Sequence, residues 1–134
     1  MEMPSISLLS ITPLYVALLG LIWIVMTLRV GLYRVKNEIN IGDGGDPEMQ
    51  RRVRGQGNFI ESVPLAVALL LVMELVGASD TWLHALGATL VLGRLLHYVG
   101  LTEIGPFQCR PAGMFATLGV YLISSGWILV DLYL

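Results

Sequence analysis

Four polar residues between positions 51 and 61 are spaced so that they could bind one ligand together. Arg51, Arg54, Asn58 and Glu61 follow one another at intervals of 3, 4 and 3 residues. Because each residue of an α-helix turns by about 100°, this spacing places all of them along one helical face. Arginine binds carboxylates through a planar fork, a glutamate can hold an ammonium group, and Asn58 offers both a donor and an acceptor. The face therefore suits a small zwitterionic or anionic ligand with more than one carboxylate.

A second set of polar residues lies at a matching depth in a later segment. His97 and Tyr98 follow Arg94 at +3 and +4, so the sequence predicts that they share its helical face. Arg94 lies about seven residues before its apolar segment ends at Leu101, and Glu61 lies about six residues after the preceding apolar segment starts. At 1.5 Å per residue, both charges lie roughly 10 Å below the same membrane surface.

A charge at that depth needs a partner, because a charged side chain near the bilayer centre costs about 2.5–3.5 kcal/mol on insertion scales. We therefore expect Glu61 to pair with Arg94 of its own chain or of a neighbouring one. One interpretation is that this pair only holds the helices in register. The surplus of polar groups near the same end favours a cavity that opens to the cytoplasm; these groups are Arg51, Arg54, Asn58, His97 and Arg110. Arg52 lies off the face, and contact with lipid headgroups alone is an equally good interpretation of it.

The elements that must position these residues are apolar helices. The chain has 134 residues, of which 55% are hydrophobic and 13% charged, whereas a soluble domain has roughly 45–50% apolar and about 25% charged residues. Crossing a bilayer takes about 20 mostly apolar residues. The sequence meets this over four spans, about 5–30, 56–78, 80–101 and 111–133. The short connections predict an all-α membrane protein, an up-down four-helix bundle forming one domain over residues 1–134.

The basic residues predict which side each connection faces. All eight lie in or beside the first and third connections; they are Arg29, Arg34, Lys36, Arg51, Arg52, Arg54, Arg94 and Arg110. Because cytoplasmic connections are enriched in Lys and Arg, both of these connections are expected in the cytoplasm. Both chain termini are then expected on the non-cytoplasmic side.

Three further residues are interpreted structurally. Pro13 falls within the first span and can kink it, which bilayer helices tolerate. Glu74 lies near the far end of the second span, where it can reach water or bond a neighbouring helix. Asp80 is the expected N-cap of the third helix.

Several classes of protein and site are excluded by the sequence. The net charge of −2 argues against a nucleic-acid partner, which would require a basic patch. The single cysteine, Cys109, rules out an internal disulfide. Asp43 and Asp46 lie in a glycine-rich connection, but Arg54 stands where a calcium-binding loop needs a closing glutamate, so no metal is expected.

The segment 51–64, RRVRGQGNFIESVP, resembles the hallmark of the MAPEG family, the membrane-associated proteins of eicosanoid and glutathione metabolism. That hallmark has an Arg, a second Arg followed by a small residue, then Asn, then Glu three residues later, and then Pro. The segment from Arg94 to His97 resembles the family's Arg-x-x-His in its third span. Arg110 falls where the family has its thiol-activating arginine.

The resemblance implies a homotrimer in which glutathione lies between neighbouring protomers at the cytoplasmic side. It implies that Arg110 is the catalytic residue, since a nearby cation lowers a thiol pKa that is otherwise about 8.5. The thiolate would then attack a lipophilic electrophile or reduce a peroxide, with the bilayer delivering that co-substrate. The residues expected to bind glutathione are Arg51, Arg54, Asn58, Glu61, Arg94, His97 and Tyr98.

The chain departs from the eicosanoid branch of that family at three positions. Gln50 replaces an acidic residue, and Leu101 and Met114 stand where tyrosines are expected. These departures resemble the bacterial branch, which implies a bacterial inner membrane. They also leave open an alternative, a non-catalytic trimeric membrane protein that binds a lipid or a small anion in the same cavity.

Overall fold

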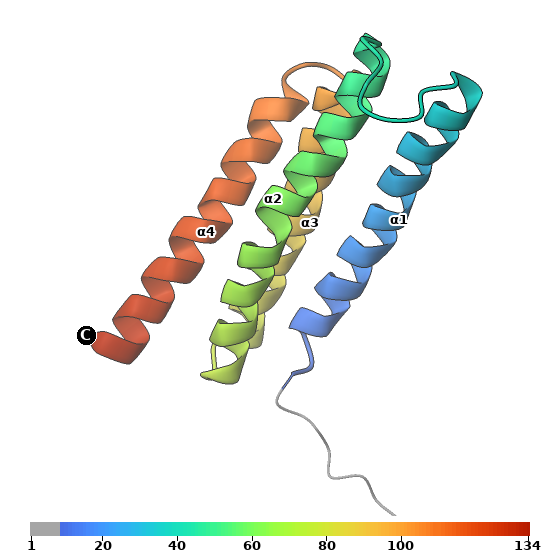
Figure 1. The fold of residues 1–134 in the computed structure, drawn as a ribbon. Helices are drawn as coiled ribbons and strands as arrows, with labels where there is room; N and C mark the ends of the chain where they lie inside the picture. Colours follow the sequence, from blue (N-terminus) through green and yellow to red (C-terminus); the bar gives the residue numbers. More distant parts are fainter. Residues whose placement is uncertain (1–8) are drawn as a thin grey trace, which may run out of the picture.

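The computed structural model describes residues 9–134, which form a bundle of four helices (Figure 1). The helices are α1 (Thr12–Lys36), α2 (Pro47–Leu75), α3 (Asp80–Leu101) and α4 (Cys109–Tyr133). The α1–α2 and α3–α4 connections lie at one end, whereas the C-terminus and the start of α1 lie at the other. The predicted all-α, up-down bundle is confirmed. Residues 5–8 of the predicted first span lie outside the described residues.

Three of the helices, α1, α2 and α4, are long and apolar enough to cross a membrane. The remaining helix, α3, has 22 residues and carries Arg94 and both histidines. Arg94 is 3% exposed and His97 is 7% exposed. Arg94 and His97 of α3 are therefore covered by the rest of the bundle.

The start of α2 is fixed by its own sequence. Asp46 accepts a hydrogen bond from the Met49 backbone N–H at 2.9 Å, and Pro47 occupies the first helical position. The Tyr33 hydroxyl donates to the same carboxylate at 3.1 Å. The Met49 N–H, and after it the Tyr33 hydroxyl, hold the pKa of Asp46 below its usual value. Because the cap fixes where α2 starts, it also fixes the positions of the following turns, which carry the polar face.

Two local predictions are wrong. Pro13 lies in the first turn of α1 and makes no kink, because a helix needs no N–H from a residue in its first turn. Asp80 is the first residue of α3 and Ser79 occupies the N-cap position, where its side chain accepts no capping hydrogen bond. Farther along the chain, α2 continues through Pro64 from Pro47 to Leu75.

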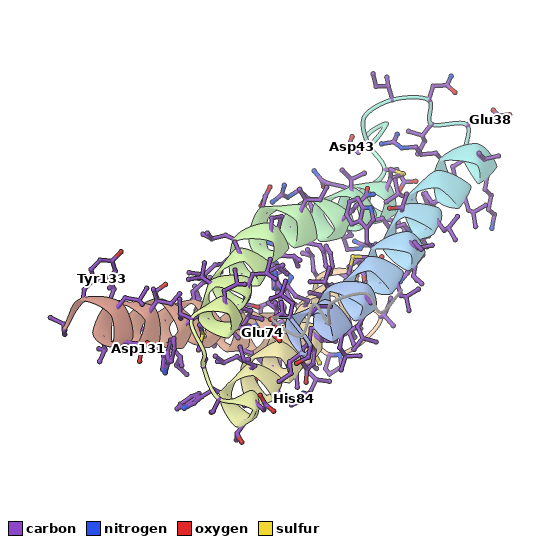
Figure 2. All side chains as sticks on the ribbon, turned by 90° about the horizontal axis from the view of Figure 1, so that it is seen from below. Glu38, Asp43, Glu74, His84, Asp131 and Tyr133 are labelled. Atoms are coloured by element: carbon purple, nitrogen blue, oxygen red, sulfur yellow. The ribbon has the colours of Figure 1, made fainter. Side chains whose placement is uncertain are left out.

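Glu74 joins the end of α2 to the start of α1. Its carboxylate accepts hydrogen bonds from the backbone N–H groups of Ser10, Ile11 and Thr12 at 2.6, 2.7 and 2.7 Å. The first N–H groups of a helix have no partner within the helix, and the helix dipole favours an anion there. Figure 2 shows Glu74 at the end of the bundle remote from Glu38 and Asp43. The prediction that Glu74 bonds a neighbouring helix is confirmed.

Helices α3 and α4 lie close together because glycines face each other between them. A Cβ atom added to Gly113 would overlap the carbonyl oxygen of Gly93 and the backbone nitrogen of His97. Small residues let membrane helices approach in this way. The approach sets the register between the two helices, so the turn of α4 that begins at Gly113 lies beside the polar turn of α3.

Candidate functional site

The polar row predicted on α2 lies on the outer face of the bundle. Arg54 and Glu61 are exposed and Asn58 is half-buried, whereas Gly55 and Phe59 on the adjoining side of the same turns are buried. The core therefore fixes the orientation of α2 and turns the polar row outward. The prediction that these residues share one face is confirmed.

Arg54 and Glu61 form an ion pair along this outer face. The Arg54 Nη1 atom lies 3.4 Å from the Glu61 Oε1 atom, and both side chains are 58% exposed. The pair extends over two turns of α2, with Asn58 between its members. Both charged groups are accessible from outside the protomer, where a ligand or a second chain could compete for them.

Behind this row, the buried guanidinium of Arg94 donates a hydrogen bond to Asn58. Its Nη1 atom lies 2.8 Å from the Asn58 Oδ1 atom. Asn58 thus connects the outer row of α2 with the interior charge of α3. The Arg94 Nε atom has no hydrogen-bond partner among the described residues, although it is buried.

The predicted pairing of Glu61 with Arg94 is wrong within a single chain. Asn58 occupies the place expected for Glu61, and Glu61 pairs with Arg54 instead. Asn58 precedes Glu61 by three residues, which corresponds to about 4.5 Å along a helix. The depths estimated from the sequence placed Glu61 and Arg94 at the same level. In the structure, α2 is shifted relative to α3 by about one turn from that estimate, so Asn58 lies level with Arg94.

A cavity of about 150 Å³ lies beside Arg94 between α2, α3 and α4, and we call it the α2–α3–α4 cavity. Its lining residues are Asn58, Ser62, Arg94, His97, Met114, Thr117, Leu118 and Tyr121. Figure 1 shows α3 behind α2, with α4 beside them. Of the predicted site residues, the structure brings Asn58, Arg94 and His97 together here.

The contribution of α4 to this cavity was missed from the sequence. Met114, Thr117, Leu118 and Tyr121 are spaced at +3, +4 and +7, the same periodicity that identified the polar row of α2. The Tyr121 hydroxyl donates a hydrogen bond to the carbonyl oxygen of Ser62, which ties α4 to α2 at the cavity. A search for polar residues on one face of the fourth span would have found Thr117 and Tyr121.

Arg51 does not line the cavity, because acidic residues at the membrane surface hold it. Its guanidinium lies 3.1 Å from Glu48 and 3.6 Å from Glu103, which belongs to the α3–α4 connection. Arg52 lies 2.6 Å from the other oxygen of Glu48 and stacks at 4.4 Å over the Tyr33 ring. This network holds the two connections of the same end together, so both arginines have a structural role in the protomer.

Tyr98 lies on a different side of α3 from the cavity. Its ring packs against Gly55 of α2, and the Arg29 guanidinium carbon lies 5.5 Å from the ring centre. Its hydroxyl is buried and has no hydrogen-bond partner among residues 9–134. The structure therefore does not bring Tyr98 together with Arg94 and His97 at one site.

Arg110 lies at the second position of α4, at the rim of the site. Its backbone packs against Gly100, one turn beyond His97 on α3, and its side chain is exposed. Within the described part of the chain, no ion pair holds its guanidinium. Arg110 is therefore a cation available to a ligand at the end of the bundle that carries both basic connections.

This arrangement can bind an extended anionic molecule. Arg54 and Glu61 offer charges of both signs on the outer face, and the half-buried Asn58 lies between them. The buried Arg94 lies behind this row, and Arg110 adds a cation at the rim. Charge-assisted hydrogen bonds from arginine are stronger than those between neutral groups. Among the described residues, no group of three or more His, Cys, Asp or Glu side chains is placed to hold a metal ion.

Comparisons with known proteins give the family of the chain. Residues 12–130 match the MAPEG family. The chain is 36% identical over 107 residues to the inner membrane protein YecN of Escherichia coli strain K12, a match that covers 80% of this chain and 81% of the relative. The YecN protein of Escherichia coli O6:H1 strain CFT073 matches to the same extent. The helical bundle, the polar row of α2 and these matches together show that the chain is a membrane protein belonging to the MAPEG family.

Proposed function

We propose that this protein is a glutathione-dependent membrane enzyme of the transferase or peroxidase type. The observation that carries the proposal is the row of Arg54, Asn58 and Glu61 on the exposed face of α2, backed by the buried Arg94. The row supplies partners for the carboxylates and the ammonium group of the tripeptide. Membership of a family named for glutathione metabolism supports the same ligand.

The site of one protomer is only part of the proposed binding site. A cavity of about 150 Å³ is too small for a whole tripeptide, so most of glutathione would lie against the outer face of α2. An exposed row of charges on an otherwise apolar membrane helix calls for a covering partner, because isolated charges facing lipid are costly. A homotrimer with glutathione between neighbouring protomers supplies that cover. Glu61 could meet Arg94 of another chain in such an assembly.

Arg110 is the proposed catalytic residue. Its exposed guanidinium would lie near the sulfur and favour the thiolate over the thiol, with the released proton passing to water. In a transferase reaction the sulfur would then form a bond to the electrophilic carbon, and the leaving group would depart with its electron pair. The apolar co-substrate would arrive through the bilayer beside α4.

The proposed location is a bacterial inner membrane, with the site facing the cytoplasm and both termini on the opposite side. The relative YecN is named an inner membrane protein, which supports an inner membrane location. The basic residues around the α1–α2 and α3–α4 connections support the orientation.

The second candidate is a non-catalytic trimer that binds a lipid or a small anion. The small cavity beside a buried cation favours it. The two candidates differ in what happens to a bound thiol, since only the enzyme stabilises a thiolate.

The experiment that separates them follows the thiolate absorbance of glutathione added to purified protein in detergent. The wild type is expected to give a saturable thiolate signal, and Arg110→Ala is expected to lose it while keeping its fold. Lys36→Ala is a matched control, because Lys36 is an exposed cation at the same end of the bundle but away from the site. The enzyme proposal fails if millimolar glutathione gives neither a thiolate signal nor heat of binding with the wild type.

A further inference from the structure

Arg51 lies on the same face of α2 as the polar row, but its guanidinium is paired with acidic residues of the same chain. It precedes Arg54 by three residues, which places it one helical turn away on that face. Its Nη2 atom lies 3.1 Å from Glu48 and its Nη1 atom lies 3.6 Å from Glu103. Glutathione has two carboxylates, whereas the exposed part of the row offers one arginine, Arg54. Arg51 is therefore the nearest further cation on this face for a second carboxylate.

The two acids hold Arg51 in different ways. Glu48 accepts hydrogen bonds from Arg51 and Arg52, at 3.1 and 2.6 Å, and its side chain is 28% exposed. The side chain of Glu103 is 69% exposed, and its 3.6 Å contact with Arg51 is an ion pair too long to be a hydrogen bond. Exposed ion pairs contribute little to stability, because water competes for both charges. The Glu103 contact is therefore the one that a carboxylate from outside the chain could replace.

The backbone of the α3–α4 connection holds Glu103 in a conformation that favours glycine. Its φ angle is 58°, in the left-handed region, directly after Thr102 at the C-cap of α3. The next two residues, Ile104 and Gly105, both donate backbone hydrogen bonds to the Val99 carbonyl oxygen. A residue with a side chain is strained at such a position, and glycine would relieve the strain. The local turn therefore gives no reason for a glutamate, whereas its ion pair with α2 gives one.

The same contact links the proposed binding face to the connection that leads to Arg110. Arg110 follows Glu103 by seven residues and is the second residue of α4. Figure 1 shows the α3–α4 connection at the same end of the bundle as the first turns of α2. Among residues 9–134, the pair of Arg51 and Glu103 is the one ion pair that joins α2 to this connection. A ligand that replaces Glu103 would therefore release the connection beside the proposed catalytic residue.

We propose that Glu103 is a built-in competitor of the tripeptide, an autoinhibitory carboxylate that occupies the Arg51 guanidinium until a carboxylate of the ligand replaces it. The inference rests on the proposed function and adds regulation to that site. When Glu103 is displaced, Arg51 turns to the polar row and binds one carboxylate of the ligand, while Arg54 binds the other. Glu48 keeps its contact with Arg52 during the exchange, so the start of α2 stays in place.

The test is a calorimetric titration of the full chain in nanodiscs with reduced glutathione. Glu103→Gln removes the competing charge and is expected to tighten binding about three- to fivefold, the range expected for the loss of one exposed ion pair. Glu38→Gln is the matched control and is expected to bind like the wild type. Glu38 is also an exposed acid with a left-handed backbone, at a φ angle of 56°, and it forms no ion pair within residues 9–134.

A double-mutant cycle shows whether the gain in affinity depends on Arg51. In the Arg51→Gln background, Glu103→Gln is expected to leave the affinity unchanged, because the cation for which Glu103 and the ligand compete is gone. A purely structural role for Glu103 gives a different result. In that case Glu103→Gln would lower the melting temperature and leave the affinity for glutathione unchanged.

Three results would overturn the proposal. They are unchanged or weaker binding by Glu103→Gln, the same gain in the Arg51→Gln background, and the same gain with Glu38→Gln. Failure of the proposed function gives a different pattern. Tighter binding by Glu103→Gln without a thiolate signal would refute the enzyme and support the competitor, whereas a thiolate signal with unchanged affinity would do the reverse. No heat of binding with the wild type or any variant would refute both.

Discussion

The hydrogen bond from Arg94 to Asn58, 2.8 Å long, joins the one buried arginine of α3 to the row of polar residues on the outer face of α2. The contact gives Asn58 two roles. Its oxygen is committed to the interior charge, and its amide nitrogen remains available to a ligand on the outer face. The interior of the bundle and the proposed ligand surface are therefore coupled through one side chain.

Replacing Asn58 by alanine is expected to destabilise the protein, because Arg94 would lose the one side-chain partner it has within residues 9–134 while remaining buried. Hydrogen bonds to charged groups contribute about 1.5–3 kcal/mol, and we expect a loss of that size. Thermal unfolding in detergent measures it. Gln56→Ala is the matched control, since Gln56 lies on the same helix and its side chain bonds the exposed side of Thr27. Equal melting of Asn58→Ala and Gln56→Ala would contradict the role assigned to Asn58.

Replacing Glu61 by alanine is expected to affect binding more than folding. Its partner Arg54 is exposed to the same extent, and exposed ion pairs contribute less than about 1 kcal/mol. Glutathione binding, measured by calorimetry, is expected to weaken by about tenfold as one charge-assisted contact is lost. A variant that unfolds like Asn58→Ala but binds glutathione normally would show that Glu61 has a structural role and no ligand role.

Replacing Glu74 by glutamine is expected to lower stability without changing ligand binding. The carboxylate accepts from three successive backbone N–H groups at the start of α1, and a neutral amide oxygen is a weaker acceptor for them. The expected loss is about 1–2 kcal/mol. Asp131→Asn is a matched control, an exposed acid-to-amide change near the C-terminus. The melting temperature should fall for Glu74→Gln and stay constant for Asp131→Asn; the reverse order would refute the assignment.

The environment of Asp46, in the α1–α2 connection, predicts how the stability of the folded protein depends on pH. The Met49 N–H and the Tyr33 hydroxyl hold the pKa of Asp46 below its usual value. A carboxyl whose pKa is lower in the folded chain stabilises the fold above the unfolded pKa, about 3.9, and this contribution is lost as the pH falls through the folded pKa. The melting temperature is therefore expected to decrease on acidification below about pH 4. Asp46→Asn should show a smaller decrease, since asparagine still caps the helix. Identical acid profiles would contradict the prediction.

The four helices could be predicted from the sequence because long apolar segments with short connections leave few alternative folds. Helix ends were harder to locate. Residues 3–12 carry no charge, so the charge pattern gives no signal for the start of α1 at Thr12. In the structure that start is marked by Glu74, which comes from another helix and caps it. A contact of this kind depends on tertiary structure and leaves no local pattern.

The polar row of α2 could also be predicted, whereas its partners on α3 could not. The predicted partner of Arg94, Glu61, lies about one helical turn from the observed partner, Asn58. Depths estimated from the ends of apolar segments are accurate only to about one turn. His97 and Tyr98 both lie near Arg94 on a helical wheel, but they are 100° apart and flank it on opposite sides. His97 therefore faces the α2–α3–α4 cavity, and Tyr98 packs against Gly55.

The most direct test of the account is a calorimetric titration of the wild-type protein in nanodiscs with reduced glutathione. The account predicts saturable heat of binding, and it predicts that Arg54→Gln, which changes an exposed residue of the α2 row, weakens the affinity by about tenfold. No heat at millimolar glutathione, or the same affinity with and without Arg54, would contradict the claim that this face of α2 binds the tripeptide.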